Sequence, residues 1–146
     1  MSDTDDLVAL RQLVDRYADA VDHRDTKAFT VLFGGDGTLT LPALGSGEPS
    51  TLTGPSLAAA LEPLAVYDRT FHHVGAAVFE IDGDSATGRV QCSAHHYERT
   101  HNGPIDLVMY IVYRDEYRRS GPGWSFASRV VDVRWTEARP AHRVRR

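Results

Sequence analysis

The second half of the chain constrains the fold most, because it reads as four long β-strands joined by short turns. Residues that favour tight turns, Gly, Pro, Asn and Asp, gather at 82–84, 102–104 and 120–123. Between these turns, the alternation of apolar and polar residues predicts strands over about 70–81, 86–99, 105–117 and 124–135. Strands joined by such short turns pair antiparallel. The sequence therefore predicts a curved antiparallel meander.

The segment before this meander predicts helices. Apolar residues at three- and four-residue steps predict an amphipathic first helix. Asp25 is suited to capping a second helix, and Gly34-Gly35 to ending it. The expected elements, in chain order, are helices over about 4–23 and 25–33, a strand over 38–41, a loop over 42–54 and a third helix starting near 55 and limited by Pro63.

Together these elements predict a single α+β domain over residues 1–146. Three N-terminal helices would pack on one face of the curved antiparallel sheet and form a cone with an internal pocket. The 146 residues, 42% of them apolar, are enough to bury a core. The basic tail over about 138–146 is expected to fray at the end of the chain.

Composition and charge exclude several classes of function. No stretch approaches the roughly 20 apolar residues of a membrane span, so no membrane association is expected. The acidic N-terminus lacks the features of a signal peptide, and we expect a cytoplasmic protein. A net charge of −4 and a pI of about 5.9 do not fit a nucleic-acid partner.

Two histidines are predicted to face the interior of the cone. His96 shares the strand parity of Val90, Cys92 and Ala94, an apolar set that should face the helices. A three-residue turn at 82–84 would place His72 opposite Ala94 and close to His96. A two-residue turn would instead bring His72 to the face of His95, because a slip of one residue reverses every side chain. The three-residue turn is preferred, since it joins two apolar faces, one of which runs from His72 through Val74 and Ala76 to Val78. The outer face is then expected to carry apolar residues that could meet a partner: Phe71, Phe79, Tyr97 and Val131.

A carboxylate and a tyrosine on the first helix complete the candidate site. Asp22 lies at the edge of the apolar stripe, from which it could hydrogen-bond a histidine and fix its tautomer. Tyr17 lies in the middle of the stripe, where its hydroxyl could point into the pocket. The alternatives are that the histidines and Tyr17 are ordinary core residues and that Asp22 is a solvated helix end. His73 or His95 could also take the place of its neighbour in the pocket.

Several short motifs resemble the SnoaL-like branch of the nuclear transport factor 2-like superfamily, which includes scytalone dehydratase and a bile acid dehydratase. The motifs occupy 17–25, 72–75, 86–89, 95–97, 124–127 and 132–135. The resemblance implies a catalytic role for Asp22, His72 and His96, a pocket-lining Tyr17 and a homodimer or higher homo-oligomer. Val74, Ala94 and Met109 are expected to line an apolar pocket for a small-molecule substrate.

Two imidazoles and a carboxylate in an apolar pocket can perform acid–base chemistry without a cofactor. The sequence therefore predicts a cofactor-independent lyase, a dehydratase acting on a small cyclic or polyketide-like hydroxy-ketone. The alternatives are a cyclase or isomerase that uses the same groups, and a non-catalytic binding or dimerisation module. No metal site is expected, because neighbouring histidines on one strand face opposite ways and the only cysteine is Cys92.

Overall fold

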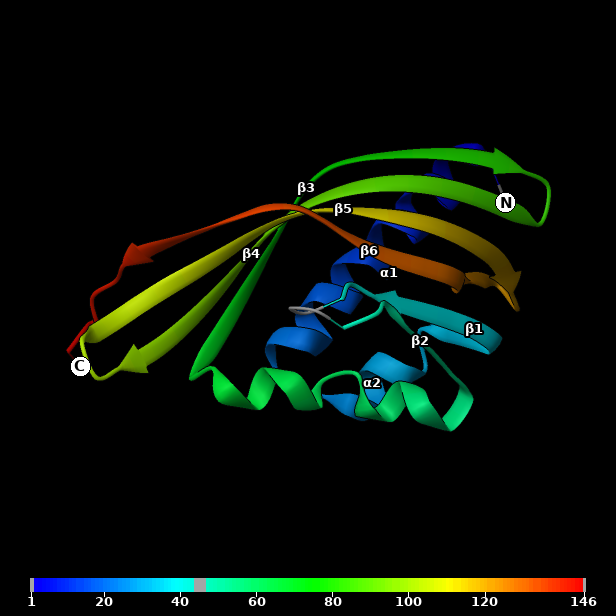
Figure 1. The fold of residues 1–146 in the computed structure, drawn as a ribbon. Helices are drawn as coiled ribbons and strands as arrows, with labels where there is room; N and C mark the ends of the chain where they lie inside the picture. Colours follow the sequence, from blue (N-terminus) through cyan, green and yellow to red (C-terminus); the bar gives the residue numbers. More distant parts are fainter. Residues whose placement is uncertain (1, 44–46, 146) are drawn as a thin grey trace.

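The computed structural model describes residues 2–43 and 47–145, with helices in the first half and a long-stranded sheet in the second (Figure 1). The elements, in chain order, are α1 (Asp3–Asp22), α2 (Thr26–Thr30), β1 (Phe33–Leu41), β2 (Ser50–Thr53), the 3-10 helices η1 (Gly54–Ala59) and η2 (Glu62–Val66), β3 (Arg69–Asp82), β4 (Ser85–Thr100), β5 (Gly103–Ser120) and β6 (Gly123–Pro140). None of the helices among these residues is both long enough and apolar enough to span a bilayer.

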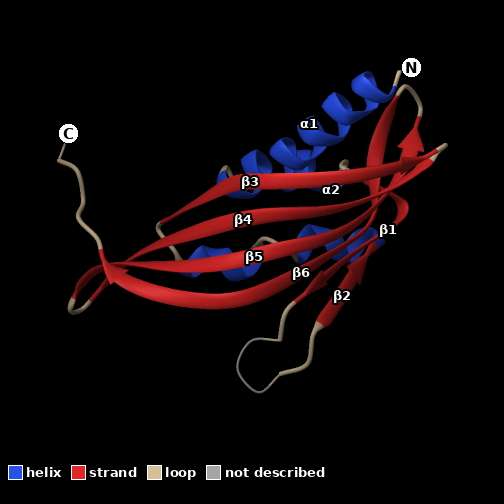
Figure 2. Ribbon diagram, turned by 90° about the horizontal axis from the view of Figure 1, so that it is seen from above, coloured by secondary structure: helices blue, strands red, loops and turns tan. Residues whose placement is uncertain are grey.

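Six strands form one curved sheet in the order β2-β1-β6-β5-β4-β3. All neighbours are antiparallel except β1 and β6, which run parallel. The sheet arches over the helices, and α1 runs alongside the edge strand β3 (Figures 1 and 2). The predicted α+β class, with helices on one face of a curved sheet, is confirmed.

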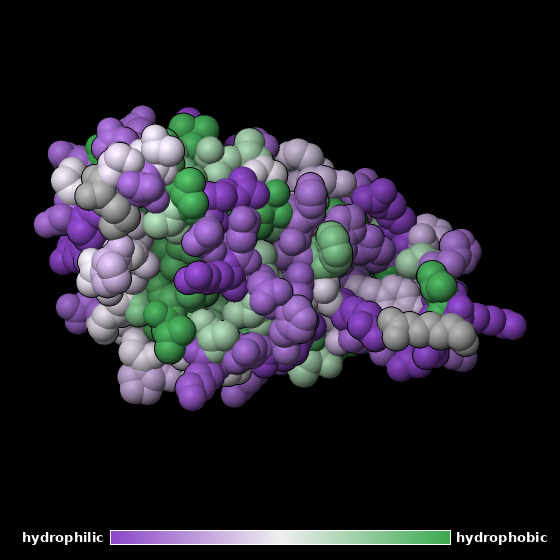
Figure 3. All heavy atoms as spheres, turned by 180° about the vertical axis from the view of Figure 1, so that it is seen from behind, coloured by the Kyte–Doolittle hydropathy of each residue, from purple (hydrophilic) through white to green (hydrophobic). Residues whose placement is uncertain are grey.

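The core fills the broad half of the molecule. Leu10 and Val14 of α1 and Phe29 of α2 are fully buried against Phe126 of β6. Viewed from behind, apolar side chains show between polar ones on this broad half, while the narrow end, where the long strands project, is mainly hydrophilic (Figure 3). The apolar stripe predicted for the first helix thus provides the layer on which the sheet closes.

Two local predictions before the meander were wrong. Gly34 and Gly35 do not end a helix but belong to β1, where the nearby Gly37 allows close packing: a Cβ there would lie 2.7 Å from the Phe126 carbonyl oxygen. Residues Ser50–Thr53, predicted as loop, form β2 and pair with β1. Part of that predicted loop, residues 44–46, lies outside the described residues.

The third predicted helix and the predicted tail also differ from the structure. Residues 54–66 form two short 3-10 segments, each with a proline in its first turn; in one continuous helix over these residues Pro63 would be an interior position, where it lacks the N–H that the helix needs. At the other end of the chain, β6 continues to Pro140, which pairs with Ile105 of β5. Residues 138–140, which were predicted to belong to the frayed tail, are therefore part of the sheet.

The hairpin of β3 and β4 combines a two-residue turn with a β-bulge. Asp82 pairs with Ser85, so the predicted three-residue turn is wrong. Further along, Val74 pairs with Cys92 and Ala77 with Val90, so two residues of β3 oppose one residue of β4. Such a bulge shifts the register by one residue.

The bulge restores the register that the sequence predicted for the histidines. His72 lies opposite Ala94, as expected, although the turn alone would have placed it elsewhere. Beyond the bulge the two faces of β3 are exchanged relative to the prediction. Val78, expected inside, is exposed, and Phe79, expected outside, packs against the core. Arg11 of α1 donates to the carbonyl oxygens of Val74 and Gly75 at the bulge, at 3.3 and 2.9 Å, and stabilises it.

Candidate active site

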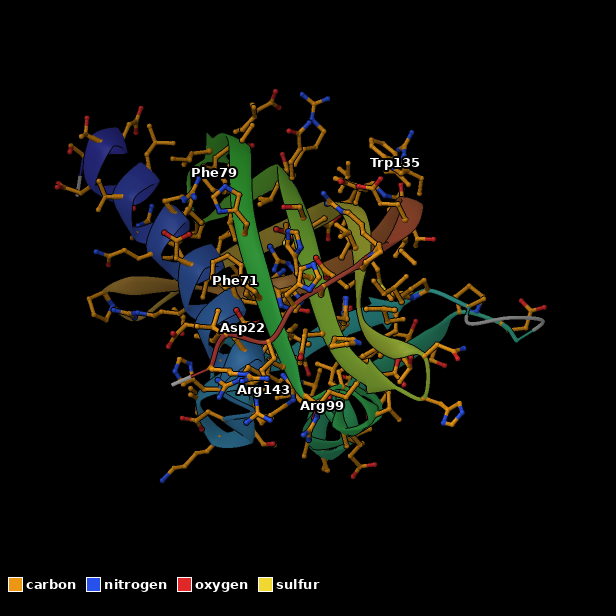
Figure 4. The ribbon with its side chains drawn as sticks, turned by 90° about the vertical axis from the view of Figure 1, so that its left-hand side faces the viewer. Asp22, Phe71, Phe79, Arg99, Trp135 and Arg143 are labelled. Carbon is orange, nitrogen blue, oxygen red and sulfur yellow. The ribbon has the colours of Figure 1, made fainter. Side chains whose placement is uncertain are left out.

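Asp22, the last residue of α1, forms a close pair with His72 of β3. Its Oδ1 lies 2.7 Å from His72 Nδ1, and its Oδ2 accepts a hydrogen bond from the His72 backbone N–H at 2.9 Å. The Thr70 hydroxyl donates to the same Oδ1 at 3.0 Å. Figure 4 shows Asp22 at the end of α1 beside β3. The predicted meeting of this carboxylate with His72 is present in the structure.

The surroundings of Asp22 favour its ionised form. Burial raises the pKa of this carboxyl, but the hydrogen bonds from the His72 side chain and backbone and from Thr70 outweigh burial and hold the pKa below its usual value. An ionised carboxylate only accepts hydrogen bonds. His72 Nδ1 must therefore carry the proton, which leaves Nε2 of this ring as the free, basic nitrogen.

His96 faces the same side of the sheet as His72. Its residue is 3% exposed, and the two imidazole centroids are 6.0 Å apart. His96 Nδ1 lies 3.0 Å from the Leu107 carbonyl oxygen, which can only accept, so Nδ1 is the donor and Nε2 is free. Burial lowers the pKa of His96, which keeps the ring neutral at pH 7.

The other two histidines of the paired motifs lie on the outer face. His73 is exposed, and His95 pairs with Asp106 at 2.7 Å on the side of the sheet away from α1. Neither replaces its neighbour in the interior. Within the described ranges, no three His, Cys, Asp or Glu side chains converge in a way that could hold a metal ion.

The residues predicted to line the pocket lie on the concave face of the sheet, in or against the packed core, and none of them lines the cavity beside Asp22. Val74 and Met109 are half-buried and pack against the core, and Ala94 between them is fully buried. Tyr17 is also buried, and its ring packs against Phe29 and the other core aromatics, so it is part of the core in this structure. Burial raises the pKa of Tyr17 to about 12, and its hydroxyl stays protonated.

A cavity of about 1000 Å³ opens where α1 ends beside η2 and β3. Asp22, Tyr67 and Thr70 are among its lining residues, and it continues around the edge strand to Phe71 and other residues of the outer face. The imidazoles of His72 and His96 are not among the lining residues, and the His72 side chain is only 8% exposed. Asp22 is thus the member of the cluster that borders this cavity.

Sequence reasoning missed a buried ion pair beneath the site. Arg129 of β6 is 0% exposed, donates twice to Asp115 at 2.8 Å and lies over the ring of Tyr17 at 4.3 Å. Its Nη1 has no hydrogen-bond partner. No local signal in the sequence marks Arg129 as buried, because its burial depends on Asp115 of the adjacent strand.

Comparisons with known proteins agree with the geometry of the fold. The structure is similar to the Kfla4162 protein from Kribbella flavida, with a TM-score of 0.83 and 23% identity, covering 93% of this chain and 95% of that one. It is also similar to hexachlorocyclohexane dehydrochlorinase LinA type 2, with a TM-score of 0.78 and 21% identity over 99% of this chain and 98% of that one. A third similar structure is a candidate scytalone dehydratase from Novosphingobium aromaticivorans, with a TM-score of 0.78 and 20% identity, covering 99% of this chain and all (100%) of that one.

These likenesses define the class of protein: the fold is that of the NTF2-like proteins, also described as cystatin-like. The SnoaL-like domain family matches residues 2–130, and the chain belongs to this family. No match is found among curated proteins.

Proposed function

We propose that this protein is a cofactor-independent lyase, a dehydratase that removes water from a small cyclic or polyketide-like hydroxy-ketone. The observation that carries the proposal is the pair of Asp22 and His72, with 2.7 Å between Oδ1 and Nδ1, next to the buried ring of His96. Two of the structurally similar proteins are named for eliminations, one as a dehydrochlorinase and one as a scytalone dehydratase candidate. Elimination is therefore the reaction class that we favour.

In the proposed reaction, His72 acts first as base and then as acid. Its free Nε2 takes a proton from the carbon next to the substrate carbonyl, and Asp22 stabilises the imidazolium that forms. The electron pair of the broken C–H bond forms the new double bond while the C–O bond of the hydroxyl breaks. The proton on Nε2 then passes to the departing oxygen, which leaves as water. Each such proton transfer is typically worth about 10²–10⁴ in rate.

His96 has a different part in this proposal. Its Nδ1–H donates to the Leu107 carbonyl oxygen, so the free Nε2 accepts a hydrogen bond rather than giving one. A lowered pKa opposes protonation of the ring at neutral pH. We therefore assign His96 the task of accepting a hydrogen bond from the substrate hydroxyl or from a bridging water, which orients the leaving group.

The substrate contacts follow from the inner wall. Leu107 and Met109 of β5 lie on the inward face with His96 and are half-buried, whereas Ile111 is buried in the core. The proposed substrate therefore enters from the cavity that Asp22 borders, and its carbon ring meets the apolar Leu107 and Met109. Tyr17 packs against Tyr113 further along β5 and against Phe126, and so belongs to the core. Apolar walls with a few placed polar groups are typical of small-molecule sites.

The test uses variants of inner and outer histidines. Cyclic hydroxy-ketones are incubated with the wild type, and mass spectrometry detects a product lighter by one water. Asp22→Asn, His72→Ala and His96→Ala should reduce turnover, whereas the outward-facing His73→Ala serves as the matched control and should retain it. Full turnover in all three inner variants would contradict the proposal, and a product of unchanged mass would indicate an isomerase or cyclase instead.

We also propose that the chain forms a homodimer or higher homo-oligomer through the outer face of its sheet. Phe71 and Trp135 expose 64% and 61% of their surface there, and Figure 4 shows them on different strands of the sheet. Phe79 and Val131, which the sequence placed on this face, pack against the core instead. Sedimentation of the wild type and of Trp135→Ser tests this proposal, and a monomeric wild type at high concentration refutes it.

A further inference from the structure

Arg24 occupies a backbone position that normally belongs to glycine. It follows the C-cap residue His23 of α1 and has a φ of 54°, in the left-handed region. Among the residues that the structure describes, Arg24 is the only non-glycine with a positive φ. Glycine is usual immediately after a helix C-cap, because it has no Cβ to be strained there, and asparagine is the next choice because its short polar side chain tolerates the left-handed region. Conformational preference alone does not explain an arginine at this position.

The side chain of Arg24 provides the explanation. Its Nη1 donates to the Thr70 hydroxyl at 2.8 Å and to the Val21 carbonyl oxygen at 2.7 Å. Its Nη2 donates to the Leu64 carbonyl oxygen of η2 at 3.4 Å. One guanidinium thus connects the end of α1, the start of β3 and the segment η2. A strained backbone persists where the surroundings fix it in this way.

The chemistry of these groups determines which one donates and which one accepts in each hydrogen bond. A guanidinium only donates, and an ionised carboxylate only accepts. Because Arg24 donates to the Thr70 oxygen, the single hydrogen of that hydroxyl is directed to Asp22 Oδ1, 3.0 Å away. Asp22 Oδ1 in turn accepts from His72 Nδ1. The chain of hydrogen bonds runs from Arg24 through Thr70 to Asp22, where it meets the proton of His72.

We propose that Arg24 is a positioning residue for the pair of Asp22 and His72. It fixes the orientation of the Thr70 hydroxyl, and Thr70 then holds the Asp22 carboxylate in the rotamer that keeps the proton on His72 Nδ1. Through Leu64, the same residue connects this arrangement to η2, the segment beside the cavity. The inference rests on the proposed function for its catalytic meaning, but the hydrogen-bond geometry can be measured without any substrate.

The decisive variant is Arg24→Gly, because it removes the side chain and relieves the backbone at once. If Arg24 served only the fold, this variant would lose stability; if it positions the pair, the variant stays folded and the pair is disturbed. The readout is proton NMR of the His72 Nδ1–H, assigned by its absence in His72→Ala. We expect a resolved downfield resonance in the wild type and its loss through solvent exchange in Arg24→Gly, with a near-unchanged melting temperature.

Two further variants complete the test. Arg24→Lys retains a donor that can reach Thr70 and should keep the resonance. Arg99→Gln removes another arginine near the start of β3, but one that binds Asp68 rather than Thr70, and should also keep it. If Arg24→Gly does not fold, Arg24→Asn, which tolerates the left-handed region, takes its place.

The outcomes separate this inference from the proposed function. Retention of the His72 resonance in Arg24→Gly or its Asn substitute overturns the positioning role, whatever the activity. Loss of the resonance in a folded variant supports the role even if no hydroxy-ketone is ever turned over. Where turnover is found, we expect Arg24→Gly to lower kcat by about 10- to 100-fold, the range that follows removal of outer hydrogen-bond partners around reactive histidines in metal sites.

Discussion

Replacing Asp22 by asparagine should destabilise the protein in a pH-dependent way. Asp22 accepts three hydrogen bonds, from His72 Nδ1, from the His72 backbone N–H and from Thr70. Asparagine at position 22 keeps only one accepting oxygen. Its amide nitrogen, which is a donor, takes the place of the other carboxylate oxygen and therefore faces another donor. A hydrogen bond to a charged group contributes about 1.5–3 kcal/mol. We therefore expect a loss of about 2–3 kcal/mol at pH 7, or about 4–12 °C in melting temperature at about 2–4 °C per kcal/mol.

The pH dependence of this loss identifies its origin. The folded-state pKa of Asp22 lies below its unfolded value, so its contribution is fully present above about pH 5 and declines as pH falls through the folded pKa. Scanning calorimetry of both proteins should show a constant difference from pH 8 to about 5 and a shrinking one below about pH 4. Asp19→Asn, at an exposed position of the same helix, is the control and should change stability by no more than about 0.5 kcal/mol. A difference for Asp22→Asn that is absent at pH 7, or equal at every pH, would refute the reasoning.

Three more predictions concern the histidines and the core. Deletion of Ala76 removes the extra residue of the bulge and leaves Gly75 opposite Gln91, so His72 should stay opposite Ala94 on the inner face and keep its Nδ1–H resonance; loss of the resonance in a folded variant would mean that the bulge itself, and not the register, holds His72 in place. Arg129→Met leaves Asp115 buried without its partner and should lower the free energy of unfolding, measured with urea, by about 3–5 kcal/mol. A smaller loss in the double variant with Asp115→Leu would confirm that the unpaired charge is the cause, and an equal or larger loss would contradict it. Since the folded-state pKa of His96 is depressed, the wild type should lose stability as pH falls below about 6.5. His96→Gln should reduce this dependence of the melting temperature on pH, measured between pH 8 and 5. An unchanged dependence would contradict the burial argument.

The long strands and the first helix could be predicted from the sequence because their signals are local. Apolar periodicity and turn residues defined them to within a few residues. The inward direction of His96 followed from strand parity, which the structure confirms. Short motifs likewise indicated membership of the SnoaL-like family, and this membership is confirmed.

The parts that could not be predicted depend on contacts between distant segments. The bulge in β3 is stabilised by Arg11 of α1, so its position does not appear in the sequence of the hairpin itself. The pairing of β1 with β2 and with β6 likewise brings distant residues together, and Gly37 is needed for close approach rather than for a turn. His72 was placed correctly opposite Ala94 although the turn was wrong, because the bulge compensates for the error.

The Asp22 pair shows the same division between local and distant information. The sequence indicated the carboxylate and the imidazole but not Thr70 or Arg24, which complete the hydrogen-bond chain. Arg129 was missed because a charged residue in a strand is usually read as solvent-exposed. Its burial depends on Asp115 of the adjacent strand, with which it pairs in register.

The parallel pairing of β1 with β6 also bears on how the chain reaches its folded state during synthesis. Leu39 has Arg129 as its partner, and most of the intervening sequence must leave the ribosome before the two can meet. Until then the edge of β1 that pairs with β6 is unpaired, and the helices have no completed sheet to pack against. Contacts that join such distant parts of a chain form slowly. A nascent protein of this architecture therefore needs to remain soluble through nearly the whole of its translation, and truncation within the last strand should yield an unfolded product.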